Sequence, residues 1–366
     1  MPATAQKSSG LDTAGPAPGG IAVPFGAVTN ERGFEMWAEM LAPIFDVEAP
    51  RDVVSDFAFG IESWTLGSAV IGRCQAPAHA FDRSRQTIAR SGIDHVMIQF
   101  HSDGGLVGDF EGRSVHGRPG DICVFDLARP ARTVSPDFRN TTLVVPRSML
   151  EPLVADYDGL HGLVLPAKNP RIRLLRRHIE ELTDQIAGLG AEDLLALVEP
   201  TVHLAAACLG TSADGRMITA PAVDRAKLAA VRSFIERHLA DPALDAAMIC
   251  RQMGLSRSVL YRLFEPLGSV AAHIRQRRLN QCLRELVSPR HRARRISEIA
   301  FGWGFTNEAS FSRAFRQAFD VSPSDARLAG ELRLRRRLRD DGPADGTGAL
   351  EPETALADWM IDLMRV

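Results

Sequence analysis

The residues that decide the fold are 296–327, ISEIAFGWGFTNEASFSRAFRQAFDVSPSDAR. Apolar side chains at helical spacing over residues 296–303 predict a helix with one buried stripe, and Gly304 can adopt the left-handed conformation that ends many helices. Thr306 or Asn307 then supplies a side-chain oxygen that can cap a second amphipathic helix. Two short helices joined by a glycine-containing turn are typical of a helix-turn-helix unit.

A second copy of this pattern lies upstream, at residues 244–264, LDAAMICRQMGLSRSVLYRLF. Its glycine, Gly254, precedes Gly304 by 50 residues, and Ser256 stands where the cap of the following helix is expected. A long helix over Val270–Val287 would join the two units. A single helix-turn-helix has many uses without DNA, but a joined pair can present recognition helices to successive major grooves, about 34 Å apart.

The motifs of the second copy carry a family resemblance. With GWGF at 302–305, FSRAF at 311–315 and FDVSPSDAR at 319–327, the segment from about residue 227 to 327 resembles the DNA-binding domain of the AraC/XylS family of bacterial transcription regulators. The resemblance implies two helix-turn-helix units in one domain, double-stranded promoter DNA as a partner and a small-molecule effector. RNA polymerase is a further partner that it implies, and activation is the commoner mode among relatives.

The charge of the chain is segregated by position. The net charge is only −2 over 366 residues, which by itself would not suggest a nucleic-acid partner. Between Pro221 and Arg327, however, 18 basic side chains outnumber 10 acidic ones, and the rest of the chain carries a net charge of −10. The basic excess therefore lies where the helix-turn-helix units lie, as expected for a surface that meets DNA.

The outward faces of the two predicted recognition helices supply the candidate DNA contacts. Base-edge contacts give specificity, and contacts with phosphates give most of the affinity. An arginine can donate to two acceptors of one guanine, and a glutamate can accept a hydrogen bond from cytosine. Glu308 lies in the first turn of its predicted helix, where a negative charge also interacts favourably with the helix dipole. The candidates for base contact are Ser258, Tyr261, Arg262, Glu308, Ala309, Ser312 and Arg313, and those for phosphate contact are Arg257 and Arg316.

Residues 57–145 show a strand pattern, in which short apolar runs alternate with turn residues. This rhythm predicts a β-sandwich or barrel, and it resembles the cupin-like sensor domain that precedes the DNA-binding domain in many AraC/XylS members. Trp64, Met97 and Phe100 could line a ligand cavity there or could be plain core. The predicted strands cover Ala69–Ala76, Gln86–Ala89, Asp94–Phe100, Leu106–Phe110, Asp121–Leu127 and Thr141–Val145.

Two enzyme classes are alternatives to a regulator. A cupin-type metal enzyme needs clustered histidine and carboxylate ligands, whereas His95, His101 and His116 occur singly. A DNA-repair methyl-acceptor fused to a helix-turn-helix domain needs a metal-held cysteine cluster near the N-terminus, and the first cysteine, Cys74, stands alone. All five cysteines are scattered, as is usual for free thiols in a reducing compartment. We therefore expect no enzyme activity, no catalytic residue, no metal and no cofactor.

A helical segment follows the strand pattern, between Pro146 and Leu209. Four apolar residues in it recur at alternating spacings of four and three, close to the seam of a coiled coil. This stripe could form the interface of a homodimer, which the family resemblance favours, or it could pack on its own β domain. The stripe consists of Leu175, Ile179, Leu182 and Ile186.

The chain is therefore expected to be an α+β multidomain protein. A cupin-like β-sandwich or barrel with a helical dimerisation segment should precede an all-α domain with two helix-turn-helix units. We place the boundaries at a disordered tail (1–30), a sensor and dimerisation domain (31–210), a linker (211–221), a DNA-binding domain (222–330) and a C-terminal tail with a short amphipathic helix (331–366).

Neither a signal-peptide pattern nor an apolar run long enough for a membrane span occurs in the sequence. We therefore expect a cytoplasmic protein without membrane contact. A short amphipathic stripe near the C-terminus should cover a patch on this chain or on another one. It consists of Leu356, Trp359, Met360, Leu363 and Met364.

Overall fold

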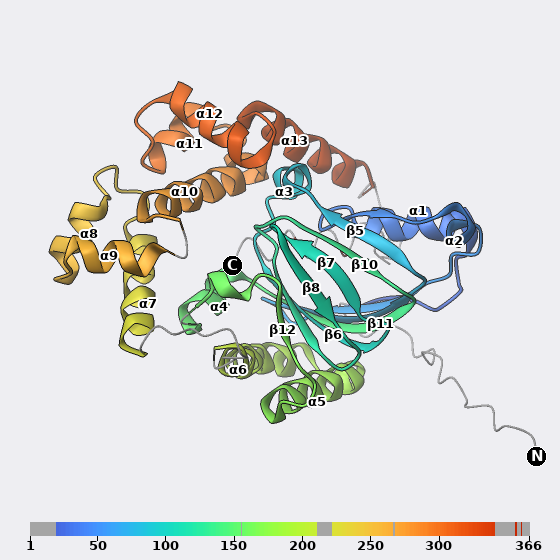
Figure 1. Ribbon diagram of the computed structural model, residues 1–366. Coiled ribbons are helices and arrows are strands. Elements are labelled where there is room, and N and C mark those ends of the chain that lie inside the picture. The colour runs from blue at the N-terminus through green and yellow to red at the C-terminus, as the bar shows by residue number, and fades with distance from the viewer. Residues whose placement is uncertain are drawn as a thin grey trace, which may run out of the picture.

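The computed structural model describes residues 20–154, 156–210, 222–265 and 268–340, together with Leu356 and Met360. A β-rich domain and a helical domain lie side by side, and helix α3 of the first contacts the second (Figure 1). No helix within these ranges is long and apolar enough to cross a membrane. The order of the elements confirms the predicted fold class, with strands first and helix-turn-helix units after them.

Within the described residues, the strands form two antiparallel sheets that share one hydrophobic core. The larger sheet has the order β1-β3-β4-β11-β6-β9-β12, and the smaller has the order β2-β5-β10-β7-β8. The strands are β1 (Gly20–Val23), β2 (Asp46–Glu48), β3 (Gly60–Thr65), β4 (Val70–Ala76), β5 (His79–Arg83), β6 (Val96–Asp103), β7 (Leu106–Phe110), β8 (Arg113–Gly117), β9 (Ile122–Asp126), β10 (Ala131–Ser135), β11 (Phe138–Val145) and β12 (Leu163–Leu165).

Five of the six predicted strand segments are confirmed, as β4, β6, β7, β9 and β11. The prediction of a strand over Gln86–Ala89 is wrong, because these residues belong to helix α3 (Arg85–Ser91). The Ser84 hydroxyl accepts a hydrogen bond from the Thr87 amide at 3.1 Å, and Gly92 ends the helix with φ of 68°. A run of four residues does not define a period, whereas these two caps define both ends of a helix.

The first strand corrects the predicted disordered tail of residues 1–30. Strand β1 pairs antiparallel with β3, and its residues Ile21 and Val23 are buried in the core. The predicted tail therefore extends too far, because β1 pairs with β3 and its alternate side chains point into the core. Residues 1–19 lie outside the described residues.

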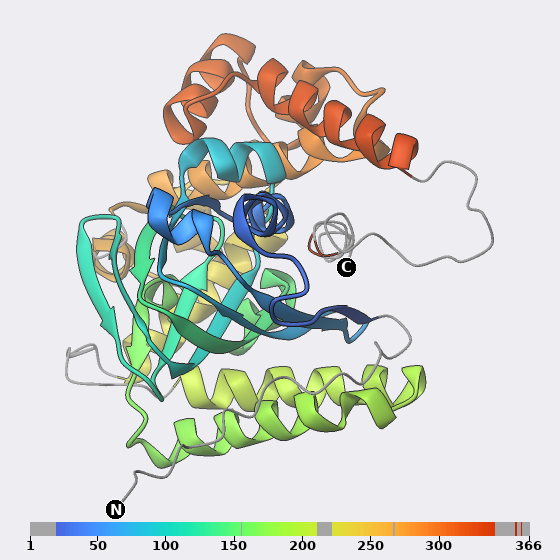
Figure 2. The same ribbon diagram turned by 90° about the vertical axis from the view of Figure 1, so that its right-hand side faces the viewer.

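Helices α5 (Pro170–Gln185) and α6 (Ala191–Leu209) cover the face of the seven-stranded sheet that points away from the smaller sheet (Figure 2). The predicted dimer stripe is at most 7% exposed and belongs to the core between these helices and the sheet. Its assignment to a dimer interface is therefore wrong, and the alternative, packing on its own β domain, is what the structure shows. The stripe residues are Leu175, Ile179, Leu182 and Ile186.

The helical domain consists of two units joined by one long helix. Helix α10 has the predicted bounds, and Trp303 packs against the cores on both sides of it. The predicted linker, 211–221, lies outside the described residues. The helices are α7 (Ala222–Arg237), α8 (Ala246–Met253), α9 (Arg257–Phe264), α10 (Val270–Val287), α11 (Ile296–Gly302), α12 (Glu308–Phe319) and α13 (Pro323–Asp340), after α1 (Asn30–Leu41), α2 (Arg51–Ser55) and α4 (Arg147–Leu150) of the β-rich domain.

Helix α3 of the β-rich domain is part of the core of the second helical unit. Its residues Ile88 and Ala89 are buried together with side chains of α10, α12 and α13, including Phe319. At the edge of this contact, Arg85 donates a hydrogen bond to the backbone carbonyl of Gln317 at 3.3 Å. The two domains are thus joined by shared hydrophobic packing as well as by the chain.

Candidate DNA interface and ligand cavity

The first helix-turn-helix unit consists of α8 and α9. Asp245 caps α8 by accepting a hydrogen bond from the Met248 amide at 2.7 Å, and Gly254 ends it in the left-handed region with φ of 64°. The Ser256 hydroxyl accepts from the Val259 amide at 3.3 Å, which confirms the predicted cap of α9. The turn between the helices therefore follows from three local sequence signals.

The second unit, α11 and α12, has the same construction. Gly304 takes a φ of 76°, and the Asn307 side chain accepts a hydrogen bond from the Ser310 amide at 2.8 Å. Of the two predicted caps, Asn307 is thus the one used, and its side-chain oxygen is already engaged within the protein. The recognition helix α12 ends at Asp320, which has a φ of 58°.

Arg278 on the joining helix holds the two units together. Its guanidinium donates to the backbone carbonyls of Leu239 at 2.9 Å, Asp241 at 2.6 Å and Gly304 at 3.1 Å. The first two carbonyls precede the first unit, and the third lies in the turn of the second unit. Side-chain atoms of Arg278 lie within 3.0 Å of where a Cβ on Gly304 would stand, so glycine serves close approach there as well as positive φ. No pattern in the sequence predicts this contact.

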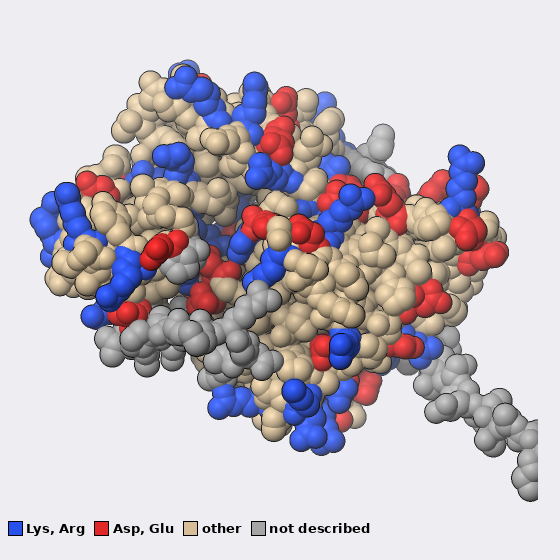
Figure 3. All heavy atoms as spheres, in the orientation of Figure 1, with Lys and Arg blue, Asp and Glu red and all other residues tan. Residues whose placement is uncertain are grey.

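The candidate base-contact residues all point away from the two cores, since none of them is buried. Ser258, Tyr261 and Arg262 are exposed on α9. On α12, Glu308, Ala309 and Arg313 are exposed and Ser312 is half-buried. The phosphate candidates Arg257 and Arg316 are exposed too, and blue side chains gather over α8 and α9 in Figure 3.

Arg262 has a partner that the sequence did not predict. Its guanidinium lies 3.2 Å from the carboxylate of Asp224 on α7, while the arginine side chain remains 60% exposed. An exposed ion pair of this kind contributes little to stability, so Arg262 can leave Asp224 for a stronger acceptor without much cost.

Two family models match the chain, and they correspond to its two domains. A model described as an AraC-binding-like domain matches residues 35–210, and a helix-turn-helix domain matches residues 249–329. The regulatory protein SoxS of Escherichia coli K12 is 35% identical over 97 residues, which cover 26% of this chain and 87% of SoxS. The chain belongs to the AraC/XylS family. It is accordingly a DNA-binding transcription regulator.

Longer relatives of this AraC/XylS member extend over both domains. The transcriptional activator NphR of a Rhodococcus species is 26% identical over 264 residues, which cover 70% of this chain and 77% of NphR. The match to the crystal structure of the AraC-like transcriptional activator CuxR covers 72% of this chain and 94% of the CuxR chain, with 25% identity and a TM-score of 0.50. These relatives are transcription regulators, and nothing in the matches favours the enzyme alternatives.

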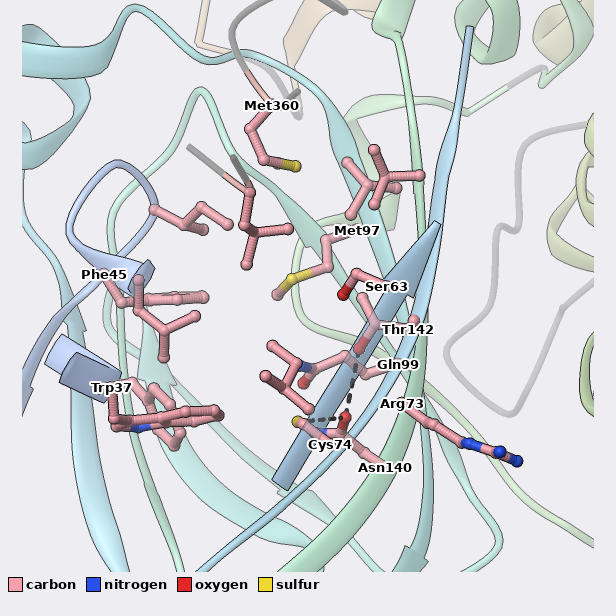
Figure 4. A pocket seen from close by; sticks show the side chains of 18 of the residues that line it. Trp37, Phe45, Ser63, Arg73, Cys74, Met97, Gln99, Asn140, Thr142 and Met360 are labelled. Carbon is pink, nitrogen blue, oxygen red and sulfur yellow. Dashed lines mark hydrogen bonds between the residues drawn. The ribbon is translucent and has the colours of Figure 1, made fainter. Parts of the chain in front are cut away.

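The sensor domain of this AraC/XylS member contains a cavity between its two sheets (Figure 4). The space between the lining atoms is about 620 Å³, including the part open to solvent. One wall is polar but uncharged, where the Asn140 amide oxygen accepts from the Cys74 thiol at 3.1 Å and from the Thr142 hydroxyl at 3.3 Å. The apolar lining consists of Trp37, Leu41, Ile44, Phe45, Ile61, Val70, Phe81, Met97, Phe138, Val144, Leu356 and Met360.

Arg73 also lies at the cavity, but its charge is already matched. Its guanidinium contacts Glu62 at 2.5 Å and Asp184 of α5 at 2.8 Å, and Figure 4 shows its side chain pointing away from the cavity. Of the residues considered from the sequence, Met97 lines the cavity, whereas Trp64 and Phe100 belong to the core beneath α5 and α6.

Trp37 at the apolar end is oriented by a buried histidine. Its indole nitrogen donates to Nε2 of His79 at 2.9 Å, and Nδ1 of His79 lies 2.7 Å from the Pro77 carbonyl. Burial lowers the pKa of His79 to about 4, so the imidazole is neutral and accepts through Nε2.

The three histidines considered for a metal site do not form one. His95 and His101 are buried in or beside β6, and His116 is exposed on β8. Among the described residues, no three histidine, cysteine or carboxylate side chains are grouped so that they could hold a metal ion. The geometry therefore offers no support for the cupin-type metal enzyme.

Charged side chains cross the boundary between the domains. Arg147 of the sensor domain contacts Asp126 at 3.3 Å and Glu151 at 2.9 Å, and Arg277 of α10 reaches Glu151 from the other side at 3.5 Å. Burial alone would raise the pKa of Glu151, but the two arginines lower it to about 2. The carboxylate is therefore charged at neutral pH and pairs with both domains.

Proposed function

We propose that this chain is an effector-responsive activator that binds double-stranded promoter DNA through both helix-turn-helix units. The observation that carries the proposal is the matched pair of capped units, fixed to each other by Arg278, with polar residues outward on both recognition helices. Its relatives NphR and CuxR are described as activators, which supports the sign of regulation.

The base contacts are assigned to the exposed faces of α9 and α12. Arg262 and Arg313 each have the reach for bidentate contact with guanine, and Glu308 can accept from cytosine. Arg257 and Arg316 supply phosphate contacts. The other base-contact residues in the proposal are Ser258, Tyr261, Ala309 and Ser312.

Sequencing DNA fragments retained by the purified full-length protein tests this assignment. Two short motifs should be enriched, with their centres about 10 base pairs apart, which is one helical turn of DNA. Retention of random fragments without any enriched motif would show that the two helices bind only the DNA backbone.

The effector in this proposal is an uncharged, largely apolar small molecule. The cavity walls are mostly aromatic and aliphatic, and the polar wall offers hydroxyl, thiol and amide groups such as Asn140 and Gln99. A charged ligand would find only Arg73, whose guanidinium is already paired with two carboxylates. A thermal-shift screen of neutral apolar compounds tests the cavity, since a ligand of the folded state raises Tm with concentration. Hits that bind Met97→Trp equally well would show that the compounds bind elsewhere.

A homodimer and contact with RNA polymerase complete the proposal. The buried stripe of α5 cannot form the dimer interface, but Leu174 and Leu195 on the outer faces of α5 and α6 are 59% and 60% exposed. We assign the dimer contact to these two leucines. Sedimentation equilibrium of Leu174→Asp and Leu195→Asp should show monomers where the unchanged protein is dimeric, and an unchanged mass in both variants would remove this face from the proposal.

A further inference from the structure

Leu356 and Met360, which lie near the C-terminal end of the chain, are buried in the sensor domain. Leu356 is 6% exposed and Met360 is 1% exposed, and both belong to the core between the two sheets. They also line the cavity, where Figure 4 shows Met360 pointing toward Met97. These two side chains therefore form part of the apolar wall of the cavity. The predicted amphipathic stripe covers this chain at these two positions.

A buried hydrogen bond fixes the position of Met360. The Nε2–H of His95 donates to the backbone carbonyl of Met360 at 2.8 Å, across 265 positions of sequence. His95 is 1% exposed, and burial, as the largest influence, lowers its pKa, so the imidazole is neutral. A backbone acceptor at a buried donor indicates a specific binding position rather than loose hydrophobic adhesion, because an unpaired buried N–H would be costly.

The same position adjoins the DNA-binding domain. Asp94, next to His95 in the chain, lies 3.8 Å from the guanidinium of Arg284 on α10. The Asp94 carboxylate also lies 4.0 Å from Nδ1 of His95. The Met360 carbonyl, His95, Asp94 and Arg284 therefore lie one after another between the cavity and the helix that joins the two recognition units, and the contact between His95 and Met360 is a hydrogen bond.

We propose that Leu356 and Met360 compete, from within the same chain, with the effector for its cavity. An effector that enters fully takes the volume of these two side chains and withdraws the Met360 carbonyl from His95. The inference rests on the proposed function of the cavity. Its quantitative consequence is that the apparent affinity for any cavity ligand falls by the fraction of molecules in which these two residues are unbound.

Hydrogen–deuterium exchange of the full-length protein tests the binding of these two residues independently of any ligand. Peptides that contain Leu356 and Met360 should exchange slowly in the unchanged protein and at least tenfold faster in the double variant Leu356→Ser, Met360→Ser. The matched control is Leu332→Ser on α13, where the leucine is 55% exposed and exchange should not change. Equal exchange in the unchanged protein and the double variant would overturn the proposal.

A neutral apolar fluorescent probe, N-phenyl-1-naphthylamine, tests the competition. The double variant should bind the probe at least tenfold more tightly than the unchanged protein, and adding Met97→Trp should abolish binding by filling the cavity. Equal affinities, with binding still lost in Met97→Trp, would overturn the competition and leave the cavity as the effector site. Failure of the double variant to bind the probe at all would overturn the competition and remove the support for the cavity as a ligand site.

Discussion

Arg232 of helix α7 donates a hydrogen bond to Asp158 of the sensor domain at 2.5 Å. The arginine side chain is only 5% exposed, and two of its other nitrogen positions lack a hydrogen-bond partner among the described residues. Asp158 therefore provides most of the compensation for burying this charge between the domains. Together with Arg277 and Glu151, this pair makes the orientation of the DNA-binding domain depend on a few sensor carboxylates.

Replacing Asp158 by asparagine should loosen this domain contact. Loss of the carboxylate leaves Arg232 underpaired, which should lower the free energy of unfolding by about 1–3 kcal/mol. Hydrogen exchange in α7 should rise at the same time. Asp156→Asn is the matched control, because Asp156 lies 3.9 Å from Arg232 and is 38% exposed, and its effect should stay within about 0.5 kcal/mol. Urea unfolding measures both, and similar losses in the two variants would refute the special role of Asp158.

Arg262→Ala and Arg313→Ala should lower affinity for the cognate site. If each arginine reads a base, each substitution should cost about 1–3 kcal/mol on the cognate site and much less on random DNA. Folding stability should change by no more than about 0.5 kcal/mol, because both residues are exposed. Fluorescence anisotropy over a library of site variants gives the base preference, and a preference unchanged by Arg313→Ala would reduce α12 to a backbone contact.

Arg316→Ala is expected to act differently, because it removes a phosphate contact. Affinity should fall alike on cognate and random DNA, and the slope of log affinity against log salt should become shallower by about one. Asp224→Asn is a control with the opposite expected effect. It releases Arg262 from its ion pair and should raise the affinity for DNA slightly. A salt slope that does not change in Arg316→Ala would place this residue away from the DNA backbone.

Arg278→Ala should decouple the two recognition helices. Three carbonyls lose a charged donor, which should destabilise the helical domain by about 1.5–3 kcal/mol. Binding to a site with both motifs should weaken at least tenfold, while tolerance to an added base pair between the motifs should increase. Arg275→Ala on the same helix, with an exposed side chain, is the control and should leave spacing preference unchanged. An unaltered spacing preference in Arg278→Ala would contradict the proposed bracing.

Stability should fall as the pH drops from about 6.5 toward 4. Burial is the largest influence on the pKa of several histidines, His95 included, and lowers it to about 4 for His79, His101 and His273 and to about 3 for His161. In this window the unfolded chain binds protons that the folded one does not, so each histidine can contribute a slope of up to about 1.4 kcal/mol per pH unit.

The measurement is urea unfolding at several pH values between 7.5 and 4.5. In His79→Gln the amide oxygen can accept the hydrogen bond from Trp37, but the side chain cannot bind a proton. The slope of the unfolding free energy against pH should therefore fall by about the contribution of one histidine. A slope that stays the same in this variant would show that His79 is not among the groups that destabilise the fold in acid.

Much of the helix-turn-helix geometry could be predicted from the sequence because it is specified locally. Ser256 and Asn307 cap the recognition helices through amides three positions away, and Gly254 and Gly304 take the left-handed conformation beside them. Such signals lie within a few residues and do not depend on the rest of the chain.

The remaining features depend on contacts between distant segments, which periodicity does not encode. The stripe that includes Leu175 has the spacing of a dimer seam, but the same spacing serves a helix that packs on its own sheet. The short apolar run of α3 predicts a strand, whereas Ser84 and Gly92 on either side of it are the residues that cap a helix. No pattern in the sequence pairs Arg262 with Asp224 or Met360 with His95.

The burial of Ile88 and Ala89 against α12 links the folding of the two domains. A helical domain cut free at the linker would present the apolar side chains that now cover them, Phe319 among them, to water. On heating, the sensor domain and the DNA-binding domain should therefore unfold in one calorimetric transition. Substitutions in the sheets that position α3 lie far from any DNA contact. They can nevertheless lower promoter occupancy, because they lower the fraction of molecules in which the second helix-turn-helix unit is folded.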